Sequence, residues 1–205
     1  MPRFLNLLIL CLFALPLRAG DVGLYPDAID PNAGFLRVAV QDEGFVNIAG
    51  KSRRIGVHGL SDFQILPAGL IEVAWSTGQT WVELPAGRHL SVLIAADGQV
   101  ETREDPIANH PAKADVTLIN SSDLSDLALF VPQAKADVFS ALAPDQMATR
   151  ALRAPLTLDF EFRAEGETMA SLIGVQLLRK TGVTFVLSGT VGDYTAQAMP
   201  NRYER

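Results

Sequence analysis

Apolar and polar residues alternate along most of this chain, in short segments that recur about every ten residues. The clearest example is residues 156–163, in which a leucine or phenylalanine occupies every second position. A period of two is typical of a β-strand that buries one face. Residues 168–180 also fit a helical face, but their surroundings favour a strand there as well. The pattern predicts an all-β protein.

The alternation is interrupted at residues 101–113, which carry five charged residues and two prolines. Pro106 and Pro111 each lack a backbone donor and disfavour helix in the residue before them. We therefore interpret residues 104–113 as a short proline-containing linker. It would join two consecutive antiparallel β-sandwich modules, residues 20–103 and 114–205, that are immunoglobulin-like or carbohydrate-binding-module-like.

The two halves also resemble each other weakly. The first predicted strand of the N-terminal half, residues 35–43, parallels residues 114–122, since each is an alternating segment followed by a polar turn. A later segment, residues 87–94, similarly parallels residues 182–188. These matches suggest an internal duplication.

Residues 1–19 have the layout of a cleavable signal peptide. Arg3 precedes an apolar run of about a dozen residues, and Ala19 supplies a small residue at the expected cleavage point. The run is too short to span a bilayer comfortably, so we expect no transmembrane helix in the mature chain. These features predict export to the periplasm.

The charge and cysteine content exclude several kinds of partner and site. Removing Arg3 and Arg18 with the signal leaves 15 basic against 23 acidic residues, a formal charge of −8. Because an acidic protein gains nothing from releasing counterions at phosphates, nucleic acid is not an expected partner. Cys11 lies within the signal, so the mature chain has no thiol for a disulfide, a nucleophile or a metal.

The sequence contains no convincing catalytic or metal-binding motif. His58, His89 and His110 share no spacing that would place two imidazoles on one zinc ion. There is no Gly-x-Ser-x-Gly motif, and Asp159 and Glu161 fit a solvated sheet face as well as a glycosidase pair. We therefore predict that the protein is not an enzyme and binds neither a metal ion nor a cofactor.

The candidate binding residues are aromatic or basic. An exposed aromatic ring can stack on sugar rings, and a basic side chain can meet a carboxylate. Burial in the core and a solvated sheet face are the respective alternatives. On this basis we select Tyr25, Arg37, Lys51, Arg53, Arg54, Trp81 and Tyr194 as residues that contact a polymer or a partner.

Residues 24–38 read Leu-Tyr, a spaced proline and then Phe-Leu-Arg-Val. In this segment the sequence shows a resemblance to the AlgF family of alginate O-acetylation proteins. The resemblance continues at residues 63–69, at Glu104-Asp-Pro106 with residues 113–121, and in the strand after Gly182. Residues 51–59 and 145–155 do not align securely. None of the shared motifs is catalytic.

The resemblance implies a periplasmic accessory component that works beside a membrane-bound O-acyltransferase and periplasmic acetyltransferases in exopolysaccharide synthesis and biofilm formation. We predict a non-catalytic adaptor that supports acetylation of mannuronate residues. The main alternative is a carbohydrate-binding module that holds alginate directly, through Trp81 and the basic segment 51–54. A third class, an acetyl-transferring enzyme, predicts a reactive serine.

Overall fold

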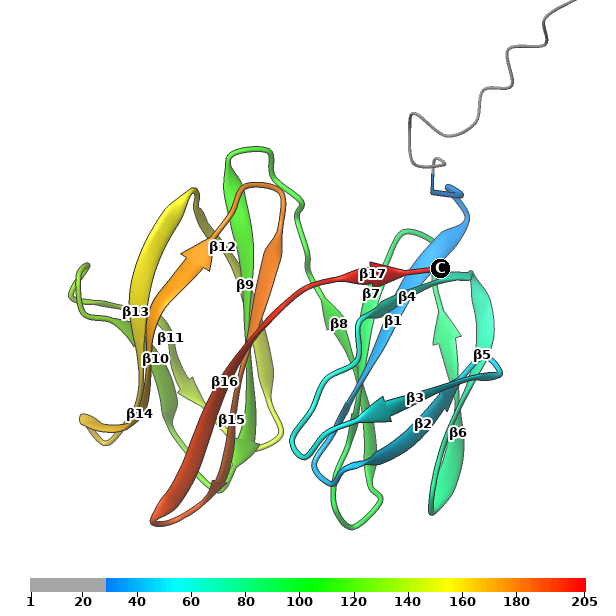
Figure 1. The fold of residues 1–205 in the computed structure, drawn as a ribbon, viewed down its shortest axis with the longest axis horizontal. Coiled ribbons are helices and arrows are strands. Elements are labelled where there is room, and N and C mark those ends of the chain that lie inside the picture. The colour runs from blue at the N-terminus through cyan, green and yellow to red at the C-terminus, as the bar shows by residue number, and fades with distance from the viewer. Residues whose placement is uncertain (1–28) are drawn as a thin grey trace, which may run out of the picture.

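A computed structural model describes residues 29–205, which contain only strands and turns (Figure 1). The predicted signal peptide and Tyr25 lie outside the described residues. The N-terminal half contains β1 (Ala33–Val40), β2 (Gly44–Ile48), β3 (Lys51–Ile55), β4 (Phe63–Pro67), β5 (Gly69–Trp75), β6 (Gly78–Leu84), β7 (His89–Ile94) and β8 (Val100–Asp105). The prediction of an all-β protein is confirmed.

The C-terminal half contains a second set of strands. These are β9 (Lys113–Ser122), β10 (Leu127–Val131), β11 (Ala136–Leu142), β12 (Met147–Arg153), β13 (Leu156–Ala164), β14 (Glu167–Leu177), β15 (Gly182–Thr190), β16 (Asp193–Pro200) and β17 (Tyr203–Glu204). The ambiguous segment 168–180 is therefore a strand in β14, as predicted.

The strands form four sheets, two from each half of the chain. The N-terminal half has an outer sheet in the order β3-β2-β5-β6 and an inner sheet in the order β4-β1-β7-β8. The C-terminal half has an outer sheet in the order β11-β10-β13-β14 and an inner sheet in the order β12-β9-β15-β16. Adding eight to each N-terminal strand number gives the C-terminal order. The two modules share one topology, which supports the duplication that the sequence suggests.

Each inner sheet contains a parallel strand pair at its centre. β1 runs parallel to β7, and β9 runs parallel to β15, while the neighbouring pairs are antiparallel. The expectation of wholly antiparallel modules is therefore wrong in detail. Alternation in the sequence indicates which face of a strand is buried. It does not indicate the direction of the neighbouring strand, because parallel and antiparallel pairs bury one face in the same way.

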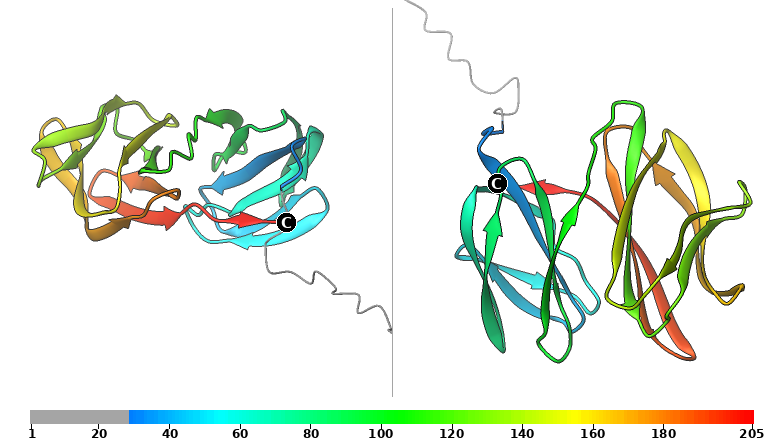
Figure 2. Two further views of the ribbon diagram at one scale, coloured as in Figure 1. Left: turned by 90° about the horizontal axis from the view of Figure 1, so that it is seen from above. Right: turned by 180° about the vertical axis from the view of Figure 1, so that it is seen from behind.

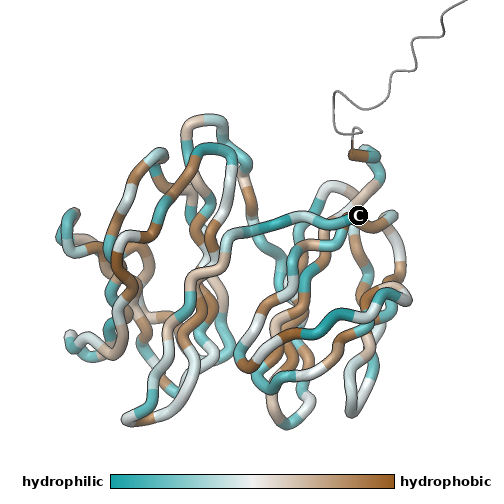
Figure 3. The backbone as a smooth tube through the Cα atoms, in the orientation of Figure 1, coloured by the Kyte–Doolittle hydropathy of each residue, from teal (hydrophilic) through white to brown (hydrophobic). Residues whose placement is uncertain are grey.

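Two strands were not predicted. β12 lies where the sequence indicated an irregular connector, residues 145–155, because its residues are only partly buried and alternate weakly. β17 lies in what reads as a charged tail, and it pairs with β4 of the N-terminal module in parallel. In Figure 3 the segment that leads from β16 to β17 is hydrophilic. The last residues of the chain therefore join the other module's inner sheet.

Each module has its own apolar core between its outer and inner sheets. Leu36 and Val38 of β1 are fully buried in the N-terminal core, and Phe160, Phe162 and Phe185 pack together in the C-terminal core. Burying such side chains contributes about 1.5–3 kcal/mol each. The alternation that predicted these strands also identified their buried faces.

The two inner sheets face each other, so the four sheets stand in a row across the molecule (Figures 1 and 2). β8 ends at Asp105 and β9 begins at Lys113, so the first two residues and the last residue of the predicted linker belong to strands. The carboxylate of Asp115 accepts hydrogen bonds from the backbone amides of Ala108 and Asn109, which holds the connecting segment against β9. The division of the chain into domains at the predicted residues stays a prediction.

Candidate functional site

Arg37 lies at the centre of the interface between the modules. It points from the outward face of β1, the face opposite the N-terminal core, and its side chain is only 1% exposed. Its guanidinium carbon stands 4.4 Å from the centre of the Phe63 ring. Guanidinium groups remain charged and stack well on aromatic faces. A full positive charge is therefore buried where the two inner sheets meet.

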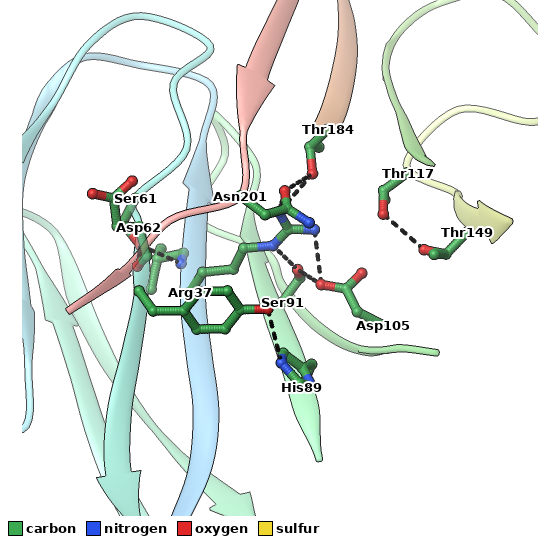
Figure 4. A network of polar contacts seen from close by, with 12 residues as sticks. Arg37, Ser61, Asp62, His89, Ser91, Asp105, Thr117, Thr149, Thr184 and Asn201 are labelled. Atoms are coloured by element: carbon green, nitrogen blue, oxygen red, sulfur yellow. Dashed lines mark hydrogen bonds and ion pairs between the residues drawn. The ribbon is translucent and has the colours of Figure 1, made fainter. Parts of the chain in front are cut away.

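The guanidinium of Arg37 is held by both modules (Figure 4). Within its own module, Nε donates to Ser91 Oγ at 2.7 Å and Nη2 pairs with Asp105 Oδ2 at 2.7 Å. Across the interface, Nη1 donates to Thr184 Oγ1 of β15 at 2.7 Å and to Asn201 Oδ1 at 3.2 Å. One side chain therefore connects β1, β7, β8, β15 and the segment that leads to β17.

Burial opposes the charged form of both partners. It lowers the pKa of Arg37, against the attraction of Asp105, and it raises the pKa of Asp105, against the attraction of Arg37 and the hydrogen bond from Ser91. The free energy lost when an ion pair is desolvated is about as large as the free energy gained from the attraction of its charges. Such a pair is therefore stable only where further hydrogen bonds satisfy both partners. Here Ser91, Thr184 and Asn201 supply further hydrogen bonds, while Asp105 Oδ1 and Asn201 Nδ2 are buried without a partner.

A hydroxyl, an imidazole and a carboxylate occur close together in this network, so it must be compared with a catalytic triad. In a triad the imidazole accepts the hydroxyl proton and the carboxylate orients the imidazole. Here Ser91 Oγ donates directly to Asp105 Oδ2 at 2.8 Å, and His89 Nε2 lies 3.2 Å from the hydroxyl of Tyr203 instead. Ser91, His89 and Asp105 are all buried. This arrangement joins modules and presents no nucleophile.

His89 and Tyr203 form the second part of the interface network. The imidazole stacks on Phe35 at 4.1 Å and meets Phe63 and Tyr203 edge-on. Desolvation, followed by the nearby charge of Arg37, lowers the pKa of His89 to about 4. Desolvation also raises the pKa of Tyr203 to about 12. Both side chains are therefore neutral near pH 7.

The C-terminal segment crosses between the modules next to this cluster. The amide of Asn201 donates to the carbonyl of Gly182, whose lack of a Cβ leaves room for the Asn201 side chain. The amide of Phe63 then donates to the carbonyl of Arg202 at 2.8 Å, and Glu204 pairs with Arg53 at 2.6 Å. The chain thus fastens its second module to its first.

A cavity of about 320 Å³ lies in the interface beyond Arg37. Its walls come from both modules and are mostly apolar side chains, with His58, Glu101, Ser121 and Asp145 among the polar ones. His58 has a left-handed backbone conformation, and its Nδ1 is buried without a hydrogen-bond partner. No lysine or arginine lines the cavity, so it does not favour an anionic sugar.

The structure separates the predicted binding residues. Lys51, Arg53 and Arg54 lie on β3, at one edge of the N-terminal outer sheet, and Trp81 lies on β6 at the opposite edge. Three strand spacings separate these edges, which is about 14 Å. Arg53 pairs with Glu204, and the exposed Arg54 pairs with Glu43 at 3.5 Å. The charge of this basic segment is therefore largely balanced.

Trp81 is 55% exposed on the outward face of the N-terminal outer sheet. Leu70, on the adjacent strand, is also exposed, at 64%. Glu72 stands directly across from Trp81, and Glu83 is two residues further along β6 on the same face. The face offers an aromatic plane, as predicted, but its flanking charges are negative.

The remaining predicted residues lie elsewhere. Tyr194, on β16, donates its hydroxyl hydrogen to Asp123 Oδ1 at 2.8 Å in an acidic hollow of the C-terminal module. Tyr25 precedes the described residues. Arg37 does meet a carboxylate, but Asp105 belongs to the same chain. Among the six described residues only Lys51, Arg53 and Arg54 lie side by side, on β3, and the structure does not bring them together with Arg37, Trp81 or Tyr194. The role of all seven in binding stays a prediction.

Sequence reasoning missed most of the interface network. Ser91 and Thr184 read as polar positions on the solvent face of a sheet, since alternation identifies only one buried face. The available signal was Arg37 itself, a cation between Leu36 and Val38 in a strongly apolar strand. Its partner Asp105 lies within the predicted linker, where a charged residue is ordinary.

No helix among residues 29–205 is long and apolar enough to cross a membrane. No group of three or more histidine, cysteine, aspartate or glutamate side chains in the same residues is arranged to hold a metal ion.

Comparisons with known proteins gave structural likenesses only. No family model matches the chain, and no curated protein matches it. Among solved structures, the chain is similar to the C-terminal domain of AlgF from P. aeruginosa, with 24% identity over 43% of this chain and 98% of that domain and a TM-score of 0.39. It is also similar to the Bacillus anthracis TIE protein, with 9% identity over 78% of this chain and 34% of that one and a TM-score of 0.28.

A third similar structure is a putative cell adhesion protein from Bacteroides ovatus. It shares 9% identity over 87% of this chain and 99% of that one, with a TM-score of 0.27. All three TM-scores are too low to assign a function by likeness.

Proposed function

We propose that this protein is an exported, non-catalytic accessory protein of a bacterial exopolysaccharide O-acetylation system. In this role it holds periplasmic acetyltransferases, beside a membrane-bound O-acyltransferase, while they acetylate the mannuronate residues of alginate. The alginate assignment is supported by the resemblance to the AlgF family at residues 24–38, 63–69 and 113–121. The adaptor role is supported by the module interface.

One observation carries the adaptor role: the polar groups that would serve catalysis are sealed between the modules. Ser91, Asp105 and His89 are at most 6% exposed, and their hydrogen bonds go to Arg37, to Tyr203 and to one another. A substrate would have to separate the modules to reach Ser91. Groups used in this way stabilise one arrangement of two bodies, which is what a scaffold requires.

The proposal is tested in cells that make the polymer. Cells that lack this protein are expected to make alginate with a reduced acetyl content, and the wild-type chain should restore it. Crosslinking in the restored cells should capture acetyltransferases, and purified protein alone should release no acetate from an acetyl ester. Acetyl transfer by the purified protein, abolished by a single Ser→Ala change, contradicts the proposal.

A second candidate function is direct binding of the polymer, and the exposed plane of Trp81 favours it. Stacking of an aromatic side chain on a sugar ring needs an exposed ring of this kind. Binding of purified protein to mannuronate oligomers, abolished by Trp81→Ala and unchanged by Leu70→Ala, would establish this function. The flanking Glu72 and Glu83 argue against it, since they repel uronate carboxylates.

A further inference from the structure

Four exposed basic residues lie at one end of the C-terminal module, and four acidic residues line a hollow at the other. At the end where β9 and β15 begin, Lys113, Arg153, Arg179 and Lys180 are all exposed. We call this set the basic tip. It lies where the connecting segment enters β9, which is uppermost in Figure 1. In a chain with a formal charge of −6, four clustered cations require an explanation.

The backbone holds the residues of the basic tip together. Lys113 and Arg153 are cross-strand partners on β9 and β12. The amide of Lys180 donates to the carbonyl of Lys113 at 3.0 Å, and Nε of Arg179 donates to the carbonyl of Ala154 at 3.0 Å. Within residues 29–205, none of these four side chains forms an ion pair with a carboxylate. Their charges are clustered and uncompensated.

Exposed leucines accompany the cations. Leu156 and Leu178 are 40% and 52% exposed, and they flank a shallow hollow lined by residues 155–157 and 176–178. Leu178 directly precedes Arg179. Single exposed leucines are ordinary, but two of them beside four cations form a surface that is apolar and basic together.

The opposite end of the module has the opposite charge. Asp123, Asp126, Glu165 and Asp193 line a hollow of about 610 Å³ there. β9, whose ten residues span roughly 30 Å, connects the two ends. The module is therefore electrically polar, and a negatively charged surface would attract it by one end and repel it by the other.

We propose that the basic tip docks on the surface of an anionic lipid membrane, with Leu156 and Leu178 entering the headgroup region. Cations near an anionic bilayer bind its headgroups, and neighbouring apolar side chains add affinity by leaving water. Long lysine and arginine side chains reach the headgroup phosphates while their stems stay on the apolar surface. Neither a polyuronate nor a phosphate ion would gain affinity from contact with the exposed leucines. This proposal does not depend on a role in acetylation.

The test is flotation of the purified protein with vesicles of phosphatidylcholine alone or mixed with phosphatidylglycerol. Binding is expected only to the mixed vesicles, and it should weaken at high salt, because the screening length falls from about 10 Å at 0.1 M to about 3 Å at 1 M. The triple variant Lys113→Gln/Arg153→Gln/Lys180→Gln should bind roughly a hundredfold more weakly, about fivefold for each cation removed. Arg179 is retained because it holds the carbonyl of Ala154.

Matched variants separate the basic tip from general charge and hydrophobicity. Lys51→Gln/Arg54→Gln/Lys135→Gln removes three exposed cations elsewhere and should bind like wild type. Leu178→Ser should weaken binding severalfold, whereas Leu70→Ser, at a more exposed leucine of the other module, should not. Circular dichroism of each variant establishes that it folds.

Three results would overturn the proposal. The first is equal vesicle binding by the wild type and the tip variant. The second is binding of polymannuronate or polyglutamate at the tip with none to vesicles, which would identify a soluble polyanion as the ligand. The third is self-association in sedimentation that Asp126→Asn/Asp193→Asn abolishes, which would identify the acidic end of a second copy as the partner.

Discussion

The two modules share one strand order but contribute opposite kinds of side chain to their interface. The central parallel pair of the N-terminal module presents Arg37 and Ser91, with Asp105 on the neighbouring strand. The corresponding pair of the C-terminal module presents Thr117 and Thr184, which are small and neutral. The N-terminal module brings the buried ion pair, and the C-terminal module brings the Thr184 hydroxyl that accepts a hydrogen bond from Arg37. The buried Asp115 of the C-terminal module bonds the connecting segment instead. Two modules of the same topology can therefore associate when the outward faces of their inner sheets carry complementary side chains.

The largest expected effect on stability comes from removing the positive charge of Arg37 alone. Arg37→Met leaves Asp105 buried without its partner, and such a change costs about 3–5 kcal/mol of unfolding free energy. Urea denaturation measures this loss. The double variant Arg37→Met/Asp105→Leu should recover much of it, since neither charge remains. Equal destabilisation by the two variants would show that the ion pair does not govern the interface.

The next effect is a loss of stability in acid that depends on His89. The folded pKa of His89, about 4, lies below its ordinary value of 6.5, so the unfolded chain binds more protons between these pH values. The contribution of the neutral imidazole to the unfolding free energy is complete above pH 6.5 and is lost as the pH falls towards 4. The loss approaches about 3 kcal/mol.

Comparison with His89→Gln isolates this effect, because Asp105, whose pKa is raised, acts in the opposite direction at the acid end. Denaturation at a series of pH values should give a smaller slope between pH 4 and 6.5 for the variant than for the wild type. Parallel slopes would place the acid sensitivity elsewhere in the chain.

A smaller effect is expected from loosening the C-terminal segment. Tyr203→Ala removes a partly exposed ring that packs on Phe35 and Phe63, and it should lower the unfolding free energy by about 1–2 kcal/mol. Hydrogen exchange should accelerate at the amide of Phe63, which donates to Arg202. Unchanged exchange there would mean that β17 does not protect the edge of β4. Tyr194→Ala, in the other module, serves as the control.

The smallest effect is expected at the basic segment that the sequence selected as a binding site. Arg54→Gln breaks only an exposed pair with Glu43, so the unfolding free energy should change by less than about 0.5 kcal/mol. Denaturation under the conditions used for Arg37→Met gives the contrast directly. A loss comparable to that of Arg37→Met would contradict the division into buried and surface charge.

The sequence predicted the strands whose pattern is local. β13 follows from strict alternation, and β14 was identified by its neighbours despite its helical pattern. β12 and β17 could not be predicted, because their residues contact other strands without burying a regular apolar face. The parallel direction of β1 against β7 depends on how the chain returns after five intervening strands. No local pattern records it.

The candidate sites show the same limit. Trp81 was correctly expected to be exposed, because it shares a face with Glu83 in a short hairpin. Arg37 was expected on a solvated face, but that face is covered by the second module. The residues of the basic tip come from three separate segments, so no charge run in the sequence reveals them. Residues 51–54 form such a run, but Glu43 and Glu204 balance it in space.

The central claim is that the Arg37 network and β17 hold the two modules as one body. The most direct test is the distance between spin labels at Thr77→Cys and Ala134→Cys, exposed positions on different modules. We expect one narrow distance distribution in the wild-type background and a broad one with Arg37→Met and Tyr203→Ala combined. A broad distribution in the wild-type background would show that the two modules move independently.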